Sequence, residues 1–197
     1  MFTGIVEEAG LVKAVTRRGH GWSIEVEAGA VASGTRPGES VAVNGCCLTV
    51  TEVAGKKLLF DLLEETREKT NLQTVQPGGR VNLESSLRGN GKVGGHFVTG
   101  HIDGMGQVLR WARSGEDWEL EVEVPAGFER YLVPKGCVAI DGISLTIGRV
   151  DGRKFNVWII PHTHEVTTLK DRKEGDKVNL ECDLLAKYVE KMTLGKK

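Results

Sequence analysis

The sequence is short of the features that mark several large classes of protein. Its formal net charge is −1, with 26 Lys and Arg against 27 Asp and Glu, so it has no basic excess for binding nucleic acid or an anionic membrane. No stretch approaches the ~20 consecutive apolar residues that span a bilayer. The N-terminus also lacks a basic segment followed by an apolar one. We therefore expect a cytoplasmic protein with a small-molecule partner, without nucleic-acid or membrane partners.

Cysteine and tryptophan are also scarce. The four cysteines, Cys46, Cys47, Cys137 and Cys182, lack the C-x₂-C spacing of a structural zinc site, and we expect reduced thiols. The four tryptophans are scattered without a basic stripe, which argues against a platform for single-stranded nucleic acid. With 26 glycines and only 5 prolines, the composition is that of an ordinary globular protein.

The two halves of the chain repeat each other. Residues 41–84 align with residues 138–181 at a constant offset of 97, with 17 identities in 44 positions and no gap. Residues 3–6 align with residues 99–102 at an offset of 96, and Gly10 aligns with Gly106 at the same offset. Each half is therefore expected to be one complete structural unit.

Within each unit the hydrophobic pattern has period two, as in residues 40–43 and 81–84, which predicts strands. Gly55 and Gly152 lie between apolar runs and predict hairpin turns. Many short strands with little helical periodicity predict an all-β fold of two tandem antiparallel β-barrels. Short connecting helices are expected over 64–72 and 162–169.

The end of the chain has helical periodicity that the repeat does not contain. Asp183 is placed to cap a helix whose apolar side chains share one face. These side chains are Leu184, Leu185, Tyr188, Val189 and Met192. We therefore divide the chain into an N-terminal barrel over 1–87, a C-terminal barrel over 88–183, and an oligomerisation helix with its tail over 184–197.

Two apparent motifs are rejected. Residues 89–94 satisfy G-x-G-x-x-G, but an expected strand follows instead of the helix that a dinucleotide site requires, so this run is interpreted as a linker. His162 and His164 could be joined by Cys182 or His101 as metal ligands, yet no further ligands recur at motif spacing. A solvated histidine pair near a turn is the preferred interpretation, and no metal is expected.

The repeats differ at informative positions inside a shared frame. In the frame Gly-x-x-Leu-Thr, Cys47 of the first half corresponds to Ser144 of the second. In the aligned segments 3–6 and 99–102, Ile5 corresponds to His101. These differences favour two related pockets with unequal tasks, because only one of the two halves offers an imidazole, an acid–base group, at this position. The alternatives are a small buried cysteine and a hydrogen-bonded interior histidine. From the residues alone, the argument reaches a duplicated barrel with paired pockets.

Four motifs together resemble one known family. They are Met1-Phe2-Thr3-Gly4-Ile5-Val6, Asn44-Gly45-Cys46-Cys47-Leu48-Thr49-Val50, Gly94-Gly95-His96 through Gly100-His101, and Asp141-Gly142-Ile143-Ser144-Leu145-Thr146. From Met1 to about Lys191 the chain is similar to the α-chain type of riboflavin synthase, duplication included. The resemblance implies two six-stranded barrels per subunit, each binding one 6,7-dimethyl-8-ribityllumazine. Two such molecules are converted to riboflavin and 5-amino-6-ribitylaminouracil by transfer of a four-carbon unit, without a cofactor.

The resemblance also implies an assembly. The subunits form a homotrimer, and the catalytic site lies where the N-terminal barrel of one subunit faces the C-terminal barrel of a neighbour. Lumazine synthase is a further expected partner. Related antenna proteins bind lumazine on the same two barrels without catalysis, so a non-catalytic lumazine- or flavin-binding protein is the alternative function. Those relatives lose pocket residues from one half, whereas this chain keeps both sets.

The site residues that the resemblance implies fall into two sets. The first pocket would use Gly4, Ile5, Val6, Cys47, Leu48, Thr49, Asp61, Leu62, Leu63, Glu64, Glu65 and Thr66. The second would use Gly100, His101, Ile102, Lys135, Ser144, Leu145, Thr146, Trp158, Ile159, Ile160, Pro161, His162 and Thr163. Cys47, Ser144 and Thr146 are the candidates for activating a nucleophile at C7 of the substrate. His101 is the candidate proton carrier.

Overall fold

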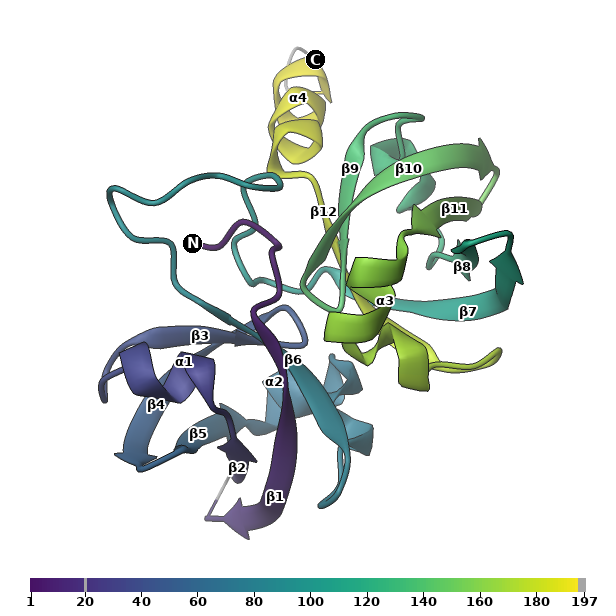
Figure 1. Ribbon diagram of the computed structural model, residues 1–197. Helices are drawn as coiled ribbons and strands as arrows, with labels where there is room; N and C mark the ends of the chain where they lie inside the picture. Colours follow the sequence, from purple (N-terminus) through teal and green to yellow (C-terminus); the bar gives the residue numbers. More distant parts are fainter. Residues whose placement is uncertain (20, 195–197) are drawn as a thin grey trace.

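The computed structural model describes residues 1–19 and 21–194, and in this part of the chain twelve strands form two closed antiparallel barrels side by side (Figure 1). The first barrel has the strand order β1-β2-β5-β4-β3-β6, with β1 (Glu8–Arg18), β2 (Gly21–Glu27), β3 (Ser40–Val43), β4 (Cys46–Ala54), β5 (Lys57–Leu63) and β6 (Arg80–Ser85). The second has the order β10-β11-β8-β7-β12-β9, with β7 (Gly104–Ser114), β8 (Asp117–Glu123), β9 (Cys137–Ile140), β10 (Ile143–Asp151), β11 (Lys154–Ile159) and β12 (Lys177–Cys182). The predicted pair of six-stranded barrels is confirmed.

Alternation along the strands separates the barrel interiors from their outer faces. In β4 the side chains of Cys46, Leu48 and Val50 are buried in the interior, whereas Cys47 and Thr49 face outward. Strand β10 repeats this pattern. The period of two therefore decides which candidate residues can meet a ligand with their side chains.

The hairpin turns fall where the sequence predicts them. Gly55 joins β4 to β5 with φ of 63°, and Gly152 joins β10 to β11 with φ of 56°. Both values lie in the left-handed region, which glycine enters without the steric cost that a Cβ imposes. The equivalence of the two turns is the first structural sign that the repeat unit is one barrel.

Short helices connect the strands. They are α1 (Ala30–Gly34), α2 (Glu64–Glu68), η1 (Asn71–Thr74), η2 (Glu129–Tyr131), α3 (Pro161–Val166) and η3 (Thr168–Asp171). The helices expected over 64–72 and 162–169 are present, but each is split into an α-helix and a 3₁₀-helix. The splits occur at Thr70 and Thr167, whose extended backbones end one turn while their hydroxyls accept a hydrogen bond from the next.

The predicted C-terminal helix is α4 (Leu184–Leu194), which projects away from the barrels (Figure 1). The Asp183 carboxylate caps it by accepting a hydrogen bond from the Leu185 N–H at 2.9 Å. Residues 195–197 of the predicted tail lie outside the described residues. Nowhere in 1–19 and 21–194 is there a helix with the length and hydrophobicity needed to cross a bilayer.

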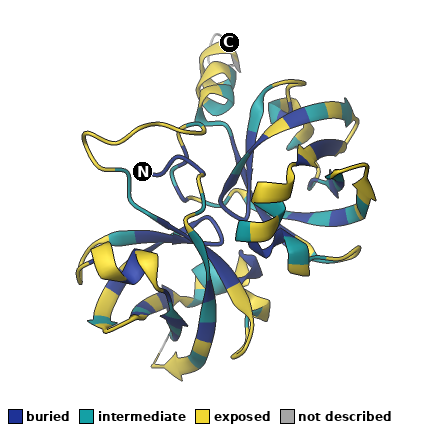
Figure 2. Ribbon diagram, in the orientation of Figure 1, coloured by how far each residue is buried: buried dark blue, intermediate teal, exposed yellow. Residues whose placement is uncertain are grey.

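A buried polar network joins the two barrels, and Figure 2 shows buried residues where they meet. The amide of Asn82 donates to the Asp141 carbonyl at 2.9 Å, and its repeat counterpart Asn179 donates to the Asn44 carbonyl at 2.8 Å. Asp141 is fully buried and forms a salt bridge with Arg172 at 2.7 Å. Because buried polar groups are costly when unpaired, these reciprocal bonds fix one barrel against the other.

Candidate functional site

The outward-facing candidate residues lie where two neighbouring strands of each barrel separate. The ladder between β4 and β5 ends at Val50 and Phe60 in the described structure, and beyond it β4 pairs only with β3 and β5 only with β2. The ladder between β10 and β11 ends in the same way at Ile147 and Val157. Each barrel thus has an unpaired strand edge that is free to take another segment.

The segment that fills each edge comes from the start of the other repeat. The Gly100 carbonyl accepts a hydrogen bond from the Cys47 N–H at 2.8 Å, and the Gly4 carbonyl accepts one from the Ser144 N–H at 2.8 Å. Val6 accordingly packs against the core of the second barrel.

This exchange corrects the grouping taken from the sequence. Gly4, Ile5 and Val6 were expected beside Cys47, and Gly100, His101 and Ile102 beside Ser144. The structure places each segment on the opposite barrel, because the two segments cross between the barrels. Phe2 and Val98 exchange backbone hydrogen bonds of 2.7 and 3.1 Å at the crossing.

Two buried carboxylates hold the exchanged segments. Glu84 accepts hydrogen bonds from the Thr3 N–H at 2.7 Å and the Gly4 N–H at 3.0 Å. Glu181 accepts equivalent bonds from the Thr99 N–H at 2.6 Å and the Gly100 N–H at 2.9 Å. Burial raises the pKa of Glu84, although these hydrogen bonds oppose the shift.

Sequence reasoning missed both carboxylates as part of the site. The available signal was the sequence Val-Asn-Leu-Glu, which ends the aligned region in both repeats. A glutamate at the end of an apolar strand in each half indicates a charged group that needs a partner.

The two glycines at the edges cannot carry a side chain. Gly4 has φ of 75°, and a Cβ on it would lie 2.6 Å from the Ser144 Cβ. Gly100 has φ of 81°, and its Cβ would lie 2.5 Å from the Cys47 Cβ. The missing side chain allows each segment to approach the candidate residue closely enough for the backbone bond.

The first site is formed on the outer face of β4 and β5. Cys47 is partly exposed there, and Thr49, Asp61 and Leu63 are exposed. His101 is also exposed and follows Gly100 along the exchanged segment. Leu48 and Leu62, which were also expected to contact substrate, point into the barrel core instead. Because of strand alternation they can offer a ligand only their backbone.

The predicted run 64–66 forms the start of α2 beside this face. The Glu64 carboxylate accepts a hydrogen bond from the Trp22 indole at 3.0 Å, and the Arg67 guanidinium lies 3.9 Å from the centre of the same ring. Glu65 forms an exposed pair with Lys69. The Thr66 carbonyl accepts the Thr70 hydroxyl at 2.7 Å. These contacts anchor the helix, so Glu64 and Glu65 already have protein partners.

The second site repeats this geometry on β10 and β11 with different side chains. Ser144 and Thr146 face outward from β10, and Trp158 and Ile160 are 48% and 55% exposed. Ile5, on the exchanged segment, is 50% exposed. The site therefore presents two hydroxyls beside apolar side chains.

Four other residues of the predicted second set have more limited roles in the described geometry. Leu145 and Ile159 point into the barrel core, so like Leu48 they can offer only backbone. Lys135 lies beside β10 at the turn before β9, where its N–H donates to the Ile147 carbonyl at 2.8 Å. His162 is exposed on α3.

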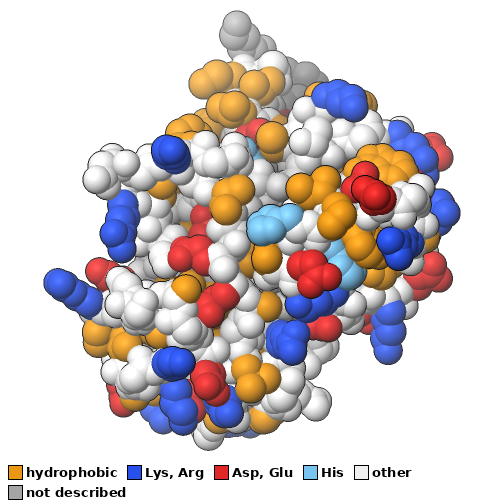
Figure 3. Space-filling model, viewed as in Figure 1, with side chains coloured by type: hydrophobic (Ala, Val, Ile, Leu, Met, Phe, Trp, Pro, Cys, Tyr) orange, Lys and Arg blue, Asp and Glu red, His pale blue; other side chains and the backbone are white. Residues whose placement is uncertain are grey.

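Helix α3 is anchored as α2 is, with other residues in the same places. His164, the counterpart of Arg67, stacks on Trp118, the counterpart of Trp22, with ring centres 3.9 Å apart and an angle of 6°. Trp111 also stacks on His164, with ring centres 5.9 Å apart. In the view of Figure 3, histidine side chains lie next to hydrophobic ones over the second barrel. The stack positions the predicted run 161–163.

One histidine that had no assigned role contacts the second site directly. The His96 Nδ1 lies 2.7 Å from the Ser144 hydroxyl oxygen. Burial lowers the pKa of His96, and the charges of Asp183 and Glu181 raise it by less. The sequence contained His96 in the Gly-Gly-His motif, but nothing in the spacing linked it to a residue 48 positions away.

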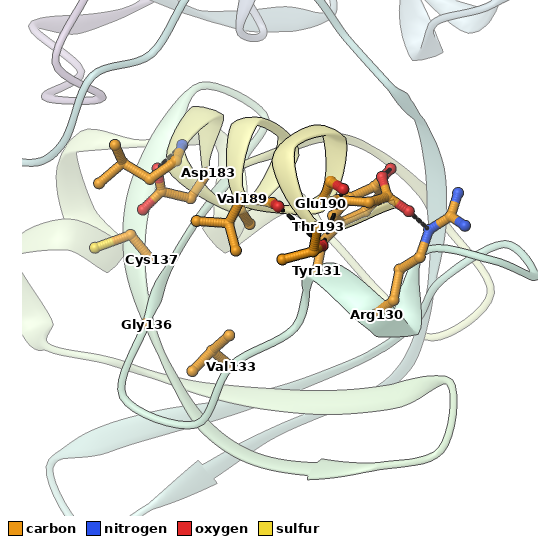
Figure 4. Close-up of a pocket in the computed structure, with 11 residues that line it drawn as sticks. Arg130, Tyr131, Val133, Gly136, Cys137, Asp183, Val189, Glu190 and Thr193 are labelled. Carbon is orange, nitrogen blue, oxygen red and sulfur yellow. Dashed lines mark hydrogen bonds and ion pairs between the residues drawn. The ribbon is translucent and has the colours of Figure 1, made fainter. Parts of the chain in front are cut away.

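A separate pocket of about 690 Å³ lies between α4 and the second barrel (Figure 4). Its walls include Val133, Cys137, Leu185 and Val189, and none of the predicted substrate residues lines it. It is therefore distinct from the two edge sites. In residues 1–19 and 21–194, no cluster of three or more His, Cys, Asp or Glu side chains is arranged to hold a metal ion.

The chain is similar to known proteins over almost its full length. It matches the lumazine binding domain family twice, over residues 3–86 and 99–183. It is 41% identical to the riboflavin synthase of Mycobacterium tuberculosis (98% of each chain) and 38% identical to that of Photobacterium phosphoreum (98% of this chain, 89% of the relative). The structure of LumP in complex with riboflavin superimposes with a TM-score of 0.86 at 23% identity, covering 92% of this chain and 99% of LumP. The chain therefore belongs to the riboflavin synthase family and carries the lumazine binding domain twice.

Proposed function

We propose that the protein is a riboflavin synthase that converts two molecules of 6,7-dimethyl-8-ribityllumazine to riboflavin and 5-amino-6-ribitylaminouracil. The observation that carries this proposal is that both barrels present a complete outward-facing site. Each site has a strand edge that its own barrel leaves open, an exchanged Gly-containing segment bonded to that edge, and a thiol or hydroxyl next to it. A reaction between two identical molecules needs two such sites.

The side chains of the sites fit the substrate's parts. Exposed apolar groups such as Leu63, Ile160 and Trp158 can cover the flat ring system, since apolar and aromatic walls dominate ligand sites. Backbone groups at the strand edges can read the uracil-like edge of the ring, and hydroxyls together with Asp61 can bind the ribityl chain.

The chemistry is mainly positioning and proton transfer. The C7 methyl of the lumazine is acidic because its carbanion is delocalised into the ring, so the protein must hold two rings together and move protons. His101 in the first site and His96 near the second are the imidazoles within reach of this task. Cys47, Ser144 and Thr146 remain the proposed groups that act at C7.

The experiment is to mix the purified protein with the lumazine and follow riboflavin absorption. We expect turnover in the presence of a chelator and without added nucleotide or flavin. The alternative function, a non-catalytic lumazine- or flavin-binding protein, predicts binding without product. Binding of one lumazine per barrel with no riboflavin formed would therefore replace the proposed activity with that alternative.

We also propose a homotrimer that depends on α4. The helix contacts its own barrel through polar groups, with Lys187 paired to Asp103 at 2.6 Å and Glu190 paired to Arg130 at 2.9 Å. Its apolar side chains are left exposed, namely Leu185, Tyr188, Val189 and Met192 at 58–69% exposure. Burying each is worth about 1.5–3 kcal/mol, which favours covering them with other copies of the chain.

Light scattering tests the assembly. We expect a trimer for the native chain and monomers for Leu185→Asp combined with Val189→Asp, whereas Lys191→Glu on the same helix should stay trimeric. If the monomeric double variant kept full turnover, the proposed catalytic site between neighbouring subunits would be wrong.

Lumazine synthase is a further proposed partner, and co-elution of the two proteins would test this association. The domain boundaries at 87 and 183 and the cytoplasmic location stay predictions.

A further inference from the structure

The imidazole of His96 is held against Ser144 by the backbone around it. The His96 N–H donates to the Thr3 carbonyl at 3.1 Å, which ties the linker to the exchanged segment. At the preceding Gly95, a Cβ would lie 2.2 Å from the Thr3 oxygen and 2.6 Å from the Ser144 hydroxyl oxygen. The linker is therefore packed so closely that the 2.7 Å contact between His96 and Ser144 is fixed by the fold.

The first site has no such contact. Cys47 occupies the place of Ser144 there, and within 1–19 and 21–194 no hydrogen bond is made by its thiol, whereas its backbone N–H bonds to Gly100. The exposed His101 reaches the first site as a neighbour along the chain of Gly100. The hydroxyl of the second site is thus the one that already has an imidazole as a partner.

The protonation of the pair follows from its surroundings. Burial lowers the pKa of His96 below its usual 6.5, and the charged groups that face it, Asp183 before α4 and Glu181 on β12, oppose this less strongly. The ring is therefore neutral at neutral pH, and a neutral imidazole has one nitrogen that accepts a hydrogen bond. With Nδ1 as that acceptor, the Ser144 hydroxyl donates to His96 and turns its lone pairs to the site.

We propose that His96 is the proton acceptor of the second site and acts through Ser144. The proton leaves the C7 methyl of the bound lumazine for the Ser144 oxygen while the hydroxyl proton passes to Nδ1 of His96. The electron pair of the broken C–H bond stays on the substrate, delocalised into the ring, and His96 becomes an imidazolium. The inference rests on the proposed synthase activity and assigns a positioning residue to it.

The test compares two variants in turnover and in pH dependence. His96→Asn keeps an acceptor near the position of Nδ1 but cannot hold the proton, so kcat should fall about 100-fold while KM stays within about threefold. In the native protein kcat should fall as pH drops through the lowered pKa of His96, because the protonated ring can no longer accept. This acid limb should disappear in His96→Asn.

Ser144→Ala supplies a second test that leaves His96 in place. It should also lose the acid limb, and adding His96→Asn to it should cause no further loss of kcat, because the two residues act as one unit. Nitrogen NMR of native protein should show an unprotonated Nδ1 at neutral pH. Additive losses in the double variant, or an acid limb that persists in either variant, would overturn the inference. Absence of riboflavin formation by the native protein would instead overturn the proposed function itself.

Discussion

The two sites share a backbone frame and differ in almost every side chain that points out of it. In both, a glycine carbonyl of an exchanged segment bonds to a strand edge, and a buried glutamate holds the segment. On this frame the first site carries a thiol, a carboxylate and an exposed imidazole, from Cys47, Asp61 and His101. The second carries a hydroxyl, an indole and an isoleucine at the same places.

This comparison separates the parts that the two sites share from the parts in which they differ. The shared parts hold the backbone of the strand edge in place, because we propose that both sites bind the same lumazine ring at that edge. The side chains that differ are exposed or partly exposed on the outer face, where we propose that the lumazine binds. We therefore propose that the two pockets take unequal parts in one reaction on a shared scaffold.

The largest expected effect is on the free energy of unfolding, and it concerns a difference between the two halves in the network that joins the barrels. The second half uses the buried pair Asp141 and Arg172, where the first half has Asn44 and Val75. Arg172→Val leaves a fully buried carboxylate unpaired, and we expect a loss of about 3–5 kcal/mol in the free energy of unfolding. Asp141→Asn added to it copies the first half and should recover most of that loss.

Urea denaturation measures both variants of the pair. The control is Arg153→Val, which removes an exposed pair with Glu123 and should cost less than about 1 kcal/mol. If the double variant is no more stable than Arg172→Val alone, the pair does more than satisfy its own charges, and the equivalence of the two halves fails there.

The next effect concerns the exchanged glycines. Gly4→Ala and Gly100→Ala each add a Cβ within 2.6 Å of the facing strand at a positive φ. Left-handed backbone costs about 1–2 kcal/mol and overpacking about 1–3 kcal/mol, so each variant should lose about 2–5 kcal/mol. Gly55→Ala is the control, since its φ of 63° brings the strain but nothing lies within 4 Å of the new Cβ.

Thermal unfolding of the three variants distinguishes the two causes. Gly4→Ala and Gly100→Ala should be similar to each other and clearly less stable than Gly55→Ala. A Gly4→Ala protein as stable as Gly55→Ala would show that the exchanged segment is not closely packed against Ser144.

The fold could be predicted from the sequence because it depends on local patterns. Alternation predicted the strands, Gly55 and Gly152 predicted the turns, Asp183 predicted the start of α4, and the repeat predicted two barrels. Alternation also explains why Cys47 and Ser144 face outward, whereas their predicted neighbours Leu48 and Leu145 point into the cores.

What it did not predict is contact between distant segments. The repeat aligns residues 3–6 with 99–102 but does not say on which barrel each lies, and the assumption that each segment contacts the barrel of its own half was wrong. The crossing at Phe2 and Val98 is a tertiary contact over 96 residues. The same limit hid the contact of His96 with Ser144 and the bonds of Glu84 and Glu181.

A smaller effect is expected at the position where the second half has the indole of Trp158 and the first half has the carboxylate of Asp61. Trp158→Leu should weaken lumazine binding at the second site about tenfold, because stacking on an aromatic ring adds to the apolar area buried. Titration followed by protein fluorescence measures this, and the ligand-induced quenching should largely vanish with Trp158 while three tryptophans remain. Unchanged quenching in Trp158→Leu would place the ligand away from β11.

The smallest effect is expected from the most direct exchange, Cys47→Ser, which gives the first site the residue of the second. The two side chains have similar size, so lumazine affinity should stay within about threefold. Turnover should fall about fivefold, because a thiol ionises more readily than a hydroxyl and, in the described residues, no imidazole hydrogen-bonds to the side chain at position 47 as His96 does to Ser144.

Ser144→Cys is the matched reciprocal variant and should lose the bond to His96. Steady-state rates and ligand titrations are compared for both. An interaction made mainly in the transition state lowers turnover and spares affinity. Equal losses of affinity and turnover in Cys47→Ser would mean that the thiol is only part of the wall of the first site, and the unequal chemistry of the two barrels would then reside in Ser144 and its histidine.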